Sequence, residues 1–547
     1  MKHRFAWWKQ PENRMKLVKA AIMGVLPLLC CLVYCAFQGR GIGQVYLPNS
    51  EWNDELFYFK QVESIVNFGY PQGFFGFNES HALKLSFAAW SPVLVFPWIL
   101  WGLLFGWNLM SPILCNIVLM MIACFVFGWL VKPTWKQLGT WAALFCLYTP
   151  FVRYMLSTMP EVICFSLLIV FYGLAITYQR DERKGYLAGM FVLAALLTLM
   201  RPYLLLFLLL PSYHLIRKQG WKGALGAGGI FGVVLVLYWA IKHYLGAEYF
   251  APLFFTDWVD AFFTQGIFGG LRYTLGKLYY MGADFVHHTV QGFRTGLASG
   301  AFFAGFLVCM GILLVQSARD LVAWCRDRKD KEDIEAENRK DNNGTACEGG
   351  VRNGLIAIEM HLALCFVAML FALLLMYKLT EGSKHLLTFM AVAVFVIPML
   401  RTRFSAKSIL LGVTFLYFYS IMALDPYDYQ VPFMTEQRAE SVELWQQETA
   451  EQMELVAEGT PNFDNVVIWT FSDVVEGNSV NTQWQLLYAL PEGFGISCCM
   501  PDYVKENFDN LQAGYICVVP GGEIEQMCTE AGYEKIVAAE NAVLYQR

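Results

Sequence analysis

Long apolar runs constrain this chain most. Residues 20–37 read AAIMGVLPLLCCLVYCAF and residues 354–377 read GLIAIEMHLALCFVAMLFALLLMY. Each run is long enough to cross a bilayer core, which needs about 20 apolar residues in a helix. Charged residues make up only 16% of the 547 residues, against about a quarter in soluble proteins. The sequence therefore predicts a polytopic α-helical membrane protein whose first run stays in place as a span rather than being cleaved.

Charge divides the chain into two parts. Residues 425–547 contain 21 acidic and 4 basic side chains, whereas residues 1–424 contain 24 acidic and 36 basic ones. We therefore expect a transmembrane domain over residues 1–425 and an acidic soluble domain over residues 426–547. Helical and strand patterns alternate in the second part, which is typical of a small α/β domain.

Basic residues also predict the orientation of the helices, because short loops rich in Lys and Arg stay in the cytoplasm. The N-terminal stretch MKHRFAWWKQ and the loops KPTWK and QRDERK are thus expected inside. A consistent path requires the proline-bearing run at 87–107 to be re-entrant or juxtamembrane on the outer side. The prediction is a multi-pass plasma membrane protein with a cytoplasmic N-terminus and an extracytoplasmic C-terminal domain.

The resulting path has about 11 spans and three notable connections. The connections are a first outer loop at 38–87, an aromatic-rich outer loop at 246–297 and a cytoplasmic linker at 318–352. The spans are predicted at 17–37, 111–131, 137–152, 160–179, two short helices that meet at Arg201-Pro202, 222–245, 298–317, 354–377, 386–400 and 407–424.

This path places several ionisable residues from distant parts of the chain near the outer membrane surface. Such residues are costly at membrane depth and are functional candidates by default. A carboxylate beside a membrane-facing groove can act as a general base, and cationic side chains near a helix N-terminus can hold a phosphate. The candidates are Asp54, Glu55, Arg153, Glu161, Arg201, Glu381, Lys384 and His385.

Several of these candidates also have a structural explanation. Asp54 and Glu55 can cap an interfacial helix and favour its positive end. Glu161 follows Pro160, a favourable helix start. Arg201 can extend its charged end to the membrane surface. The cysteines show no zinc-type spacing and read mostly as small buried hydrophobes.

The order of five short motifs resembles the GT-C glycosyltransferases. The similarity is to the polyprenyl-phosphate-sugar-dependent group, which includes the protein O-mannosyltransferases and the aminoarabinose transferase of lipid A. It covers roughly residues 17–425 and departs from the family in having Ser91-Pro92 for paired prolines, Glu161 for Asp and Lys384 for Arg. The motifs are NDELFYF (53–59), WSPVLVFPW (90–98), MPEV (159–162), LTLMRPYLLL (197–206) and EGSKHLL (381–387).

The resemblance implies a reaction and roles for these residues. The donor would be a sugar on polyprenyl monophosphate, attacked at its anomeric carbon by an acceptor hydroxyl in one inverting displacement. Asp54 would be the base, with Glu55 as a helper, and Glu161 would orient the acceptor or a basic neighbour. Arg201, Lys384, His385 or Arg153 would stabilise the lipid-phosphate leaving group.

The implied partners are a lipid-linked sugar, the bilayer, and an acceptor that is an envelope polymer, a lipid or a protein. No nucleic-acid partner is expected, and no metal site is assigned, although a divalent metal stays open. Two other functions fit the same substrate class: a transporter or flippase, and a polymerase of lipid-linked saccharides. A sensor that works through its acidic C-terminal part is a further alternative.

Overall fold

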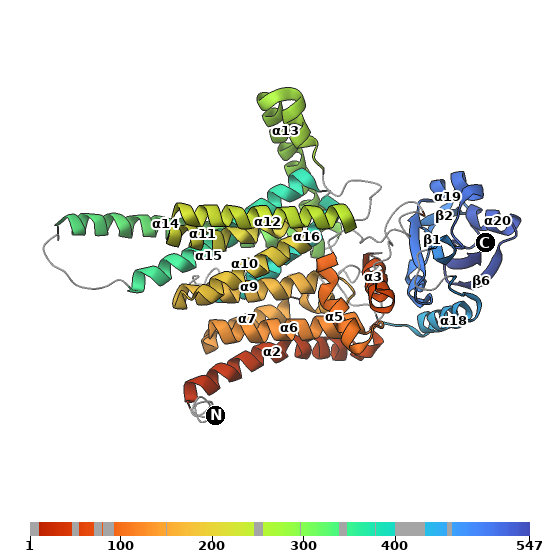
Figure 1. The fold of residues 1–547 in the computed structure, drawn as a ribbon, viewed down its shortest axis with the longest axis horizontal. Helices are drawn as coiled ribbons and strands as arrows, with labels where there is room; N and C mark the ends of the chain where they lie inside the picture. The colour runs from red at the N-terminus through yellow and green to blue at the C-terminus, as the bar shows by residue number, and fades with distance from the viewer. Residues whose placement is uncertain are drawn as a thin grey trace.

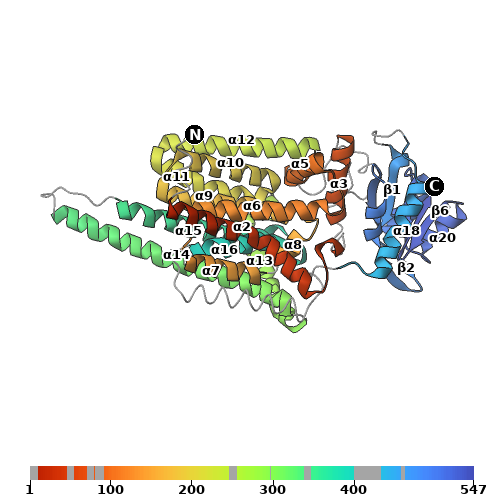
Figure 2. The same ribbon diagram turned by 90° about the horizontal axis from the view of Figure 1, so that it is seen from below.

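The computed structural model describes residues 10–45, 54–69, 79, 92–148, 150–245, 255–295, 297–337, 347–377, 379–399, 433–456 and 462–547. Figure 1 shows a bundle of helices and, at one end of it, a domain of strands and shorter helices. Helix α3 (Asp54–Phe68) lies between these two parts, as the view in Figure 2 also shows.

Six helices among the described residues are long and apolar enough to cross a membrane. The most hydrophobic 18-residue stretch of α9 is 78% buried, whereas that of α12 is only 11% buried. Helix α9 therefore lies at the centre of the bundle, and α12 presents its apolar side chains outward, as a lipid-facing helix does. The six are α2 (Pro11–Phe37), α6 (Ser111–Val131), α9 (Glu161–Asp181), α12 (Trp221–Leu245), α14 (Leu297–Glu337) and α15 (Cys347–Met376).

Further helices complete the described part of the bundle, and α13 projects from it (Figure 1). In its described part the proline-bearing run forms a 3₁₀ turn at Pro92–Val95 and the short α5, which suits the predicted juxtamembrane segment. The helices are α5 (Phe96–Phe105), α7 (Trp135–Leu147), α8 (Pro150–Met155), α10 (Lys184–Met200), α11 (Leu209–Gln219), α13 (Asp257–Thr295) and α16 (Leu379–Val396). The 3₁₀ turns are η1 (Ile42–Gln44), η2 (Pro92–Val95), η3 (Pro202–Leu208) and η4 (Ile397–Met399).

Three predicted segments differ from the structure. The span at 137–152 is two helices, α7 and α8, because Pro150 lacks the N–H that would continue α7. The outer loop at 246–297 is largely helix α13, which turns at Gly266 with φ 71°. The linker at 318–352 is largely helical at the ends of α14 and α15, since Lys, Arg, Glu and Ala are good helix formers. The span at 407–424 and the domain boundary at 425 lie outside the described residues.

Basic side chains gather at the end of the bundle far from the C-terminal domain. Lys19 Nζ donates to the carbonyl of Pro133 at 2.7 Å, and Lys16 Nζ lies 3.7 Å from the centre of the Trp129 ring. At the same ends of neighbouring helices, Lys218 pairs with Glu182 at 2.9 Å. The loops predicted to be cytoplasmic therefore share one end of the bundle.

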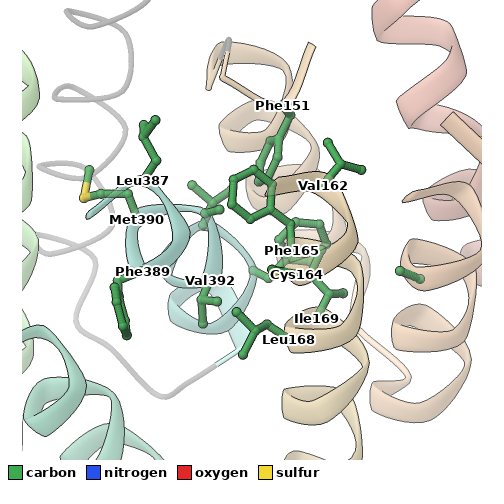
Figure 3. Close-up of a cluster of buried hydrophobic side chains, with 14 of the residues drawn as sticks. Phe151, Val162, Cys164, Phe165, Leu168, Ile169, Leu387, Phe389, Met390 and Val392 are labelled. Atoms are coloured by element: carbon green, nitrogen blue, oxygen red, sulfur yellow. The ribbon is translucent and has the colours of Figure 1, made fainter. Parts of the chain in front are cut away.

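The centre of the bundle is apolar and aromatic (Figure 3). Phe151 of α8 packs edge-on against Phe165 of α9 and Phe395 of α16, with ring centroids 6.1 and 5.7 Å apart. Val162 and Cys164, which follow Glu161 directly, are buried in the same cluster. The start of α9 is thus held in a packed core and not on a loose loop.

The C-terminal domain is built on a five-stranded sheet in the order β4-β1-β5-β7-β6. Strand β1 pairs parallel to β4 and β5, and β7 pairs antiparallel to β5 and β6. The strands are β1 (Val466–Thr470), β4 (Gly495–Cys499), β5 (Tyr515–Val518), β6 (Glu534–Ala539) and β7 (Ala542–Gln546), with a separate hairpin of β2 (Ser472–Val475) and β3 (Asn478–Asn481). Its helices are α18 (Glu436–Gln452), α19 (Pro501–Asn507) and α20 (Glu523–Glu530), with 3₁₀ turns η5 (Phe463–Asn465), η6 (Trp484–Ala489) and η7 (Phe508–Asn510).

The two faces of this sheet carry different cores, because successive strand residues point to opposite faces. Ile468 of β1 packs in the cluster that includes Val504 of α19 and Ile524 of α20. Trp469 packs on the other face, in a cluster that includes Trp445 of α18 and also Phe57 of α3. Helix α3, which lies in the predicted first outer loop, therefore contributes to the core of the C-terminal domain.

Candidate active site

A buried ion pair lies at the bundle end that faces the C-terminal domain. Arg201 Nη2 donates to Glu161 Oε1 at 2.6 Å, and both side chains are almost completely buried. Arg201 Nη1 also donates to the hydroxyl of Tyr203 at 3.1 Å. Burying an arginine costs several kcal/mol of desolvation free energy unless its partners compensate. Such a group at the end of a membrane bundle is therefore a candidate for binding a charged ligand.

Local sequence explains the position of both partners. Arg201 precedes Pro202, and the residue before a proline avoids the helical region. Arg201 accordingly has φ −144° and ψ 117° and separates α10 from η3. Glu161 is the first residue of α9 after Pro160, where a carboxylate favours the positive end of the helix. The predicted helix break and the predicted helix start are both confirmed, and the two residues 40 positions apart meet.

Helix α3 packs on the bundle that carries this pair. Its Tyr58 side chain is buried in the hydrophobic core of the bundle, and its phenol acts electrostatically on the Arg201 guanidinium. Asp54 and Glu55 lie four and three residues before Tyr58 in the same helix. Residues at these spacings are neighbours on a helix surface, with Cβ atoms about 5–6 Å apart. The acidic pair is thus about one helical turn from Tyr58, which is buried in the bundle core.

The two acids of α3 differ in accessibility. Glu55 is fully buried, whereas Asp54 at the start of the helix is only partly buried. Arg153 is also buried, in α8, eight residues before Glu161. Asp54 is therefore the carboxylate of the pair that a bound molecule can reach more readily.

A polar network that the sequence analysis missed fixes the turn before Glu161. Asn116 of α6 accepts from Trp98 Nε1 at 2.9 Å. Its amide donates to the carbonyls of Ser157 at 3.0 Å and Tyr154 at 3.4 Å. Asn116 is fully buried in an otherwise apolar helix. The single polar residue inside the apolar run ILCNIVLMM was the sequence feature that could have indicated this network.

The remaining candidates lie on α16. Glu381, Lys384 and His385 belong to the first turns of that helix, and their side chains lie outside the described residues. One turn further on, the ring of Phe389 lies 6.3 Å from that of Tyr203. The backbone of this predicted basic motif therefore begins at the same end of the bundle as Arg201. In the part of the chain that is described, no group of three or more His, Cys, Asp or Glu side chains is arranged to hold a metal.

A second buried pair joins α3 to the C-terminal domain. Lys60 Nζ lies 2.8 Å from Glu63 Oε2 and donates to the carbonyl of Leu490 at 3.2 Å. Burial raises the pKa of Glu63, the Lys60 ammonium opposes that rise, and the Glu492 carboxylate adds to it. The ammonium thus offsets part of the cost of enclosing the Glu63 carboxylate.

Removing Lys60 should make stability depend more strongly on pH. A carboxyl whose pKa is raised on folding holds its proton more tightly in the folded state, so stability falls as pH rises above about 4.3. In Lys60→Met the pKa of Glu63 rises further, because the opposing ammonium is gone. We expect the thermal unfolding midpoint of this variant to lie below that of the wild type at about pH 8 and to approach it at about pH 5.

Lys505→Met is the matched control for this prediction. Lys505 Nζ lies 3.0 Å from Asp473 Oδ1 inside the C-terminal domain. Burial would raise the pKa of Asp473, but hydrogen bonds from Ile524 and Lys505 lower it below its usual value. The fall in the thermal unfolding midpoint caused by Lys505→Met should therefore be the same at these two pH values. If Lys60→Met also lowered the unfolding midpoint equally at both pH values, the result would contradict the role given to Glu63.

Structural comparison finds chains with a similar course, among them two structures of ArnT from Cupriavidus metallidurans. The structure bound to undecaprenyl phosphate has a TM-score of 0.41 and 10% identity, with 96% of this chain and 97% of that chain covered. The apo structure has a TM-score of 0.42 and 11% identity over the same shares. No family model and no curated protein sequence matches the chain. ArnT is a GT-C aminoarabinose transferase.

Proposed function

We propose that the protein is a membrane glycosyltransferase that moves a sugar from polyprenyl phosphate to an acceptor hydroxyl at the bundle end beside the C-terminal domain. The observation that carries this proposal is the buried pair of Arg201 and Glu161 in a bundle whose core also encloses Tyr58 of α3. The site thus combines a buried cation with a helix that begins with two carboxylates and packs on the same bundle. An anionic leaving group and a base for the attacking hydroxyl are what this reaction requires.

The roles follow from charge and accessibility. Asp54 takes the proton of the acceptor hydroxyl, because it is the more accessible acid of the pair. Arg201 stabilises the negative charge that develops on the departing lipid phosphate, and fixed donors of this kind lower the barrier most where water is excluded. Glu161 holds the guanidinium in place through the 2.6 Å contact. Glu55, Arg153, Glu381, Lys384 and His385 complete the proposed substrate-binding set.

The proposed orientation follows from the two ends of the bundle. Basic residues gather at one end, and that end faces the cytoplasm by the positive-inside rule. The candidate site and the acidic C-terminal domain then lie outside. The lipid carries its sugar to that side, so no soluble nucleotide donor is required. A polyprenyl chain also suits a protein that reaches its donor within the bilayer.

A donor panel tests the proposal. The full-length protein in lipid vesicles is given labelled sugars linked either to polyprenyl phosphate or to a nucleoside diphosphate, together with crude envelope acceptors. We expect transfer from a polyprenyl-phosphate sugar and none from the nucleotide sugars. Transport of the lipid-linked sugar without formation of a new glycosidic bond would instead favour a flippase.

A further inference from the structure

We infer that Tyr488 of the C-terminal domain is a positioning residue that aligns the two halves of the candidate active site. This inference rests on the proposed function. Its ring packs on Phe59 of α3, with centroids 5.0 Å apart. Its hydroxyl forms a hydrogen bond of 3.1 Å with Thr158 Oγ1. One side chain therefore contacts both the helix that carries Asp54 and the turn that leads into Glu161.

Both contacts are enclosed. Thr158 is fully buried and Tyr488 is 7% exposed. Thr158 lies three residues before Glu161, and Phe59 follows Tyr58, which is buried in the bundle core. On its other side, Phe59 contacts Trp107, with ring centroids 5.3 Å apart and an indole hydrogen bond of 3.1 Å to the Phe59 carbonyl. A shift of Tyr488 would consequently move α3 relative to Glu161.

The C-terminal domain holds Tyr488 firmly. Tyr488 lies in η6, and the next residue, Ala489, accepts a hydrogen bond from Thr449 of α18 at 3.3 Å. Thr449 is itself completely buried. Helix α18 thus holds the η6 turn through this hydrogen bond and gives Tyr488 a rigid support.

The domain is also attached to the first outer segment at separate places. Glu79 Oε1 accepts from the backbone N–H groups of Gln512, at 2.6 Å, and Ala513. Far from there, the N–H of Met434 donates to the carbonyl of Gln44 at 2.9 Å. These contacts and the Lys60 contact restrict movement of the domain over the bundle. A domain held in this way can keep the residues of the candidate active site in a fixed geometry.

Tyr488→Phe and Thr158→Val each remove the same hydrogen bond and keep most of the packing. We expect each to lower kcat by about three- to tenfold, which is the value of one buried hydrogen bond, with the KM for the lipid donor within about twofold. The double variant should be no slower than the slower single variant, because coupled residues show non-additive effects. Tyr545→Phe is the control, since it loses a 3.0 Å hydrogen bond to Glu525 elsewhere in the same domain.

Amide hydrogen exchange of residues 54–68 and 150–161 supplies a readout that needs no enzymatic activity. Exchange in both segments should become several-fold faster in Tyr488→Phe and stay unchanged in Tyr545→Phe. Equal exchange rates in Tyr488→Phe and Tyr545→Phe would overturn the inference. Additive effects of Tyr488→Phe and Thr158→Val on kcat would overturn it as well. If the wild type transfers no sugar while the exchange result holds, the proposed function fails and the alignment by Tyr488 stands.

Discussion

Asp54→Asn should reduce sugar transfer by about 10²- to 10⁴-fold in kcat, which is the contribution of a general base. Asparagine has nearly the shape of aspartate and fits the first position of α3, so the helix and its contacts should persist. The asparagine amide, however, cannot take up the proton of the attacking hydroxyl. Donor binding should change little, because the lipid phosphate is held by the cationic side of the site. The measurement is initial transfer rate at saturating donor, with donor affinity determined separately.

Two further variants make this result specific. Asp260→Asn changes an exposed acid of α13 and should leave the rate unchanged. Glu55→Gln tests the other acid of the pair, which is fully buried, and should lower the rate far less than Asp54→Asn. A near-normal rate in Asp54→Asn, or the larger loss in Glu55→Gln, would remove Asp54 from the role of base.

Arg201→Ala should both destabilise the protein and abolish transfer. It leaves the Glu161 carboxylate buried without its cation, and breaking a buried pair in this way costs about 3–5 kcal/mol. It also removes a donor to the leaving group, for which about a 10²- to 10³-fold loss of rate is typical. Thermal unfolding in detergent and the transfer assay measure the two effects.

A double variant separates stability from function. Glu161→Gln combined with Arg201→Met removes both charges, so much of the stability should return, while transfer should not. Arg180→Met is the control, because Arg180 pairs with Asp181 at 2.8 Å at the exposed, basic end of the bundle and such pairs contribute at most about 1 kcal/mol. Normal transfer by the stable double variant would show that the pair is only structural.

The sequence predicted well those features that depend on local chemistry. Apolar length located α2, α6, α9, α12 and α15, and the prolines at 160 and 202 located the start of α9 and the end of α10. Each of these features is decided within a few residues by hydrophobic length or by the missing N–H of proline.

Features that depend on contacts between distant segments were not predictable from one sequence. The sequence placed Glu161 and Arg201 on the same side of the membrane but could not show that they pair at 2.6 Å. Nor could it show that α3 helps to form the core of the C-terminal domain, because Leu56, Phe57 and Phe59 read equally well as residues that face lipid. The strand order of the C-terminal sheet was not predictable for a similar reason, since strands β4, β6 and β7 are short and depend on pairing across the sheet.

The most direct test of the central claim is the anomeric configuration of the transferred sugar. A polyprenyl-phosphate donor of known configuration is incubated with the full-length protein, and the new linkage is assigned by nuclear magnetic resonance. A single displacement with Asp54 as the base predicts a product linkage of opposite configuration to the donor. A product that retains the donor configuration would contradict it, because retention requires a covalent intermediate or a second displacement.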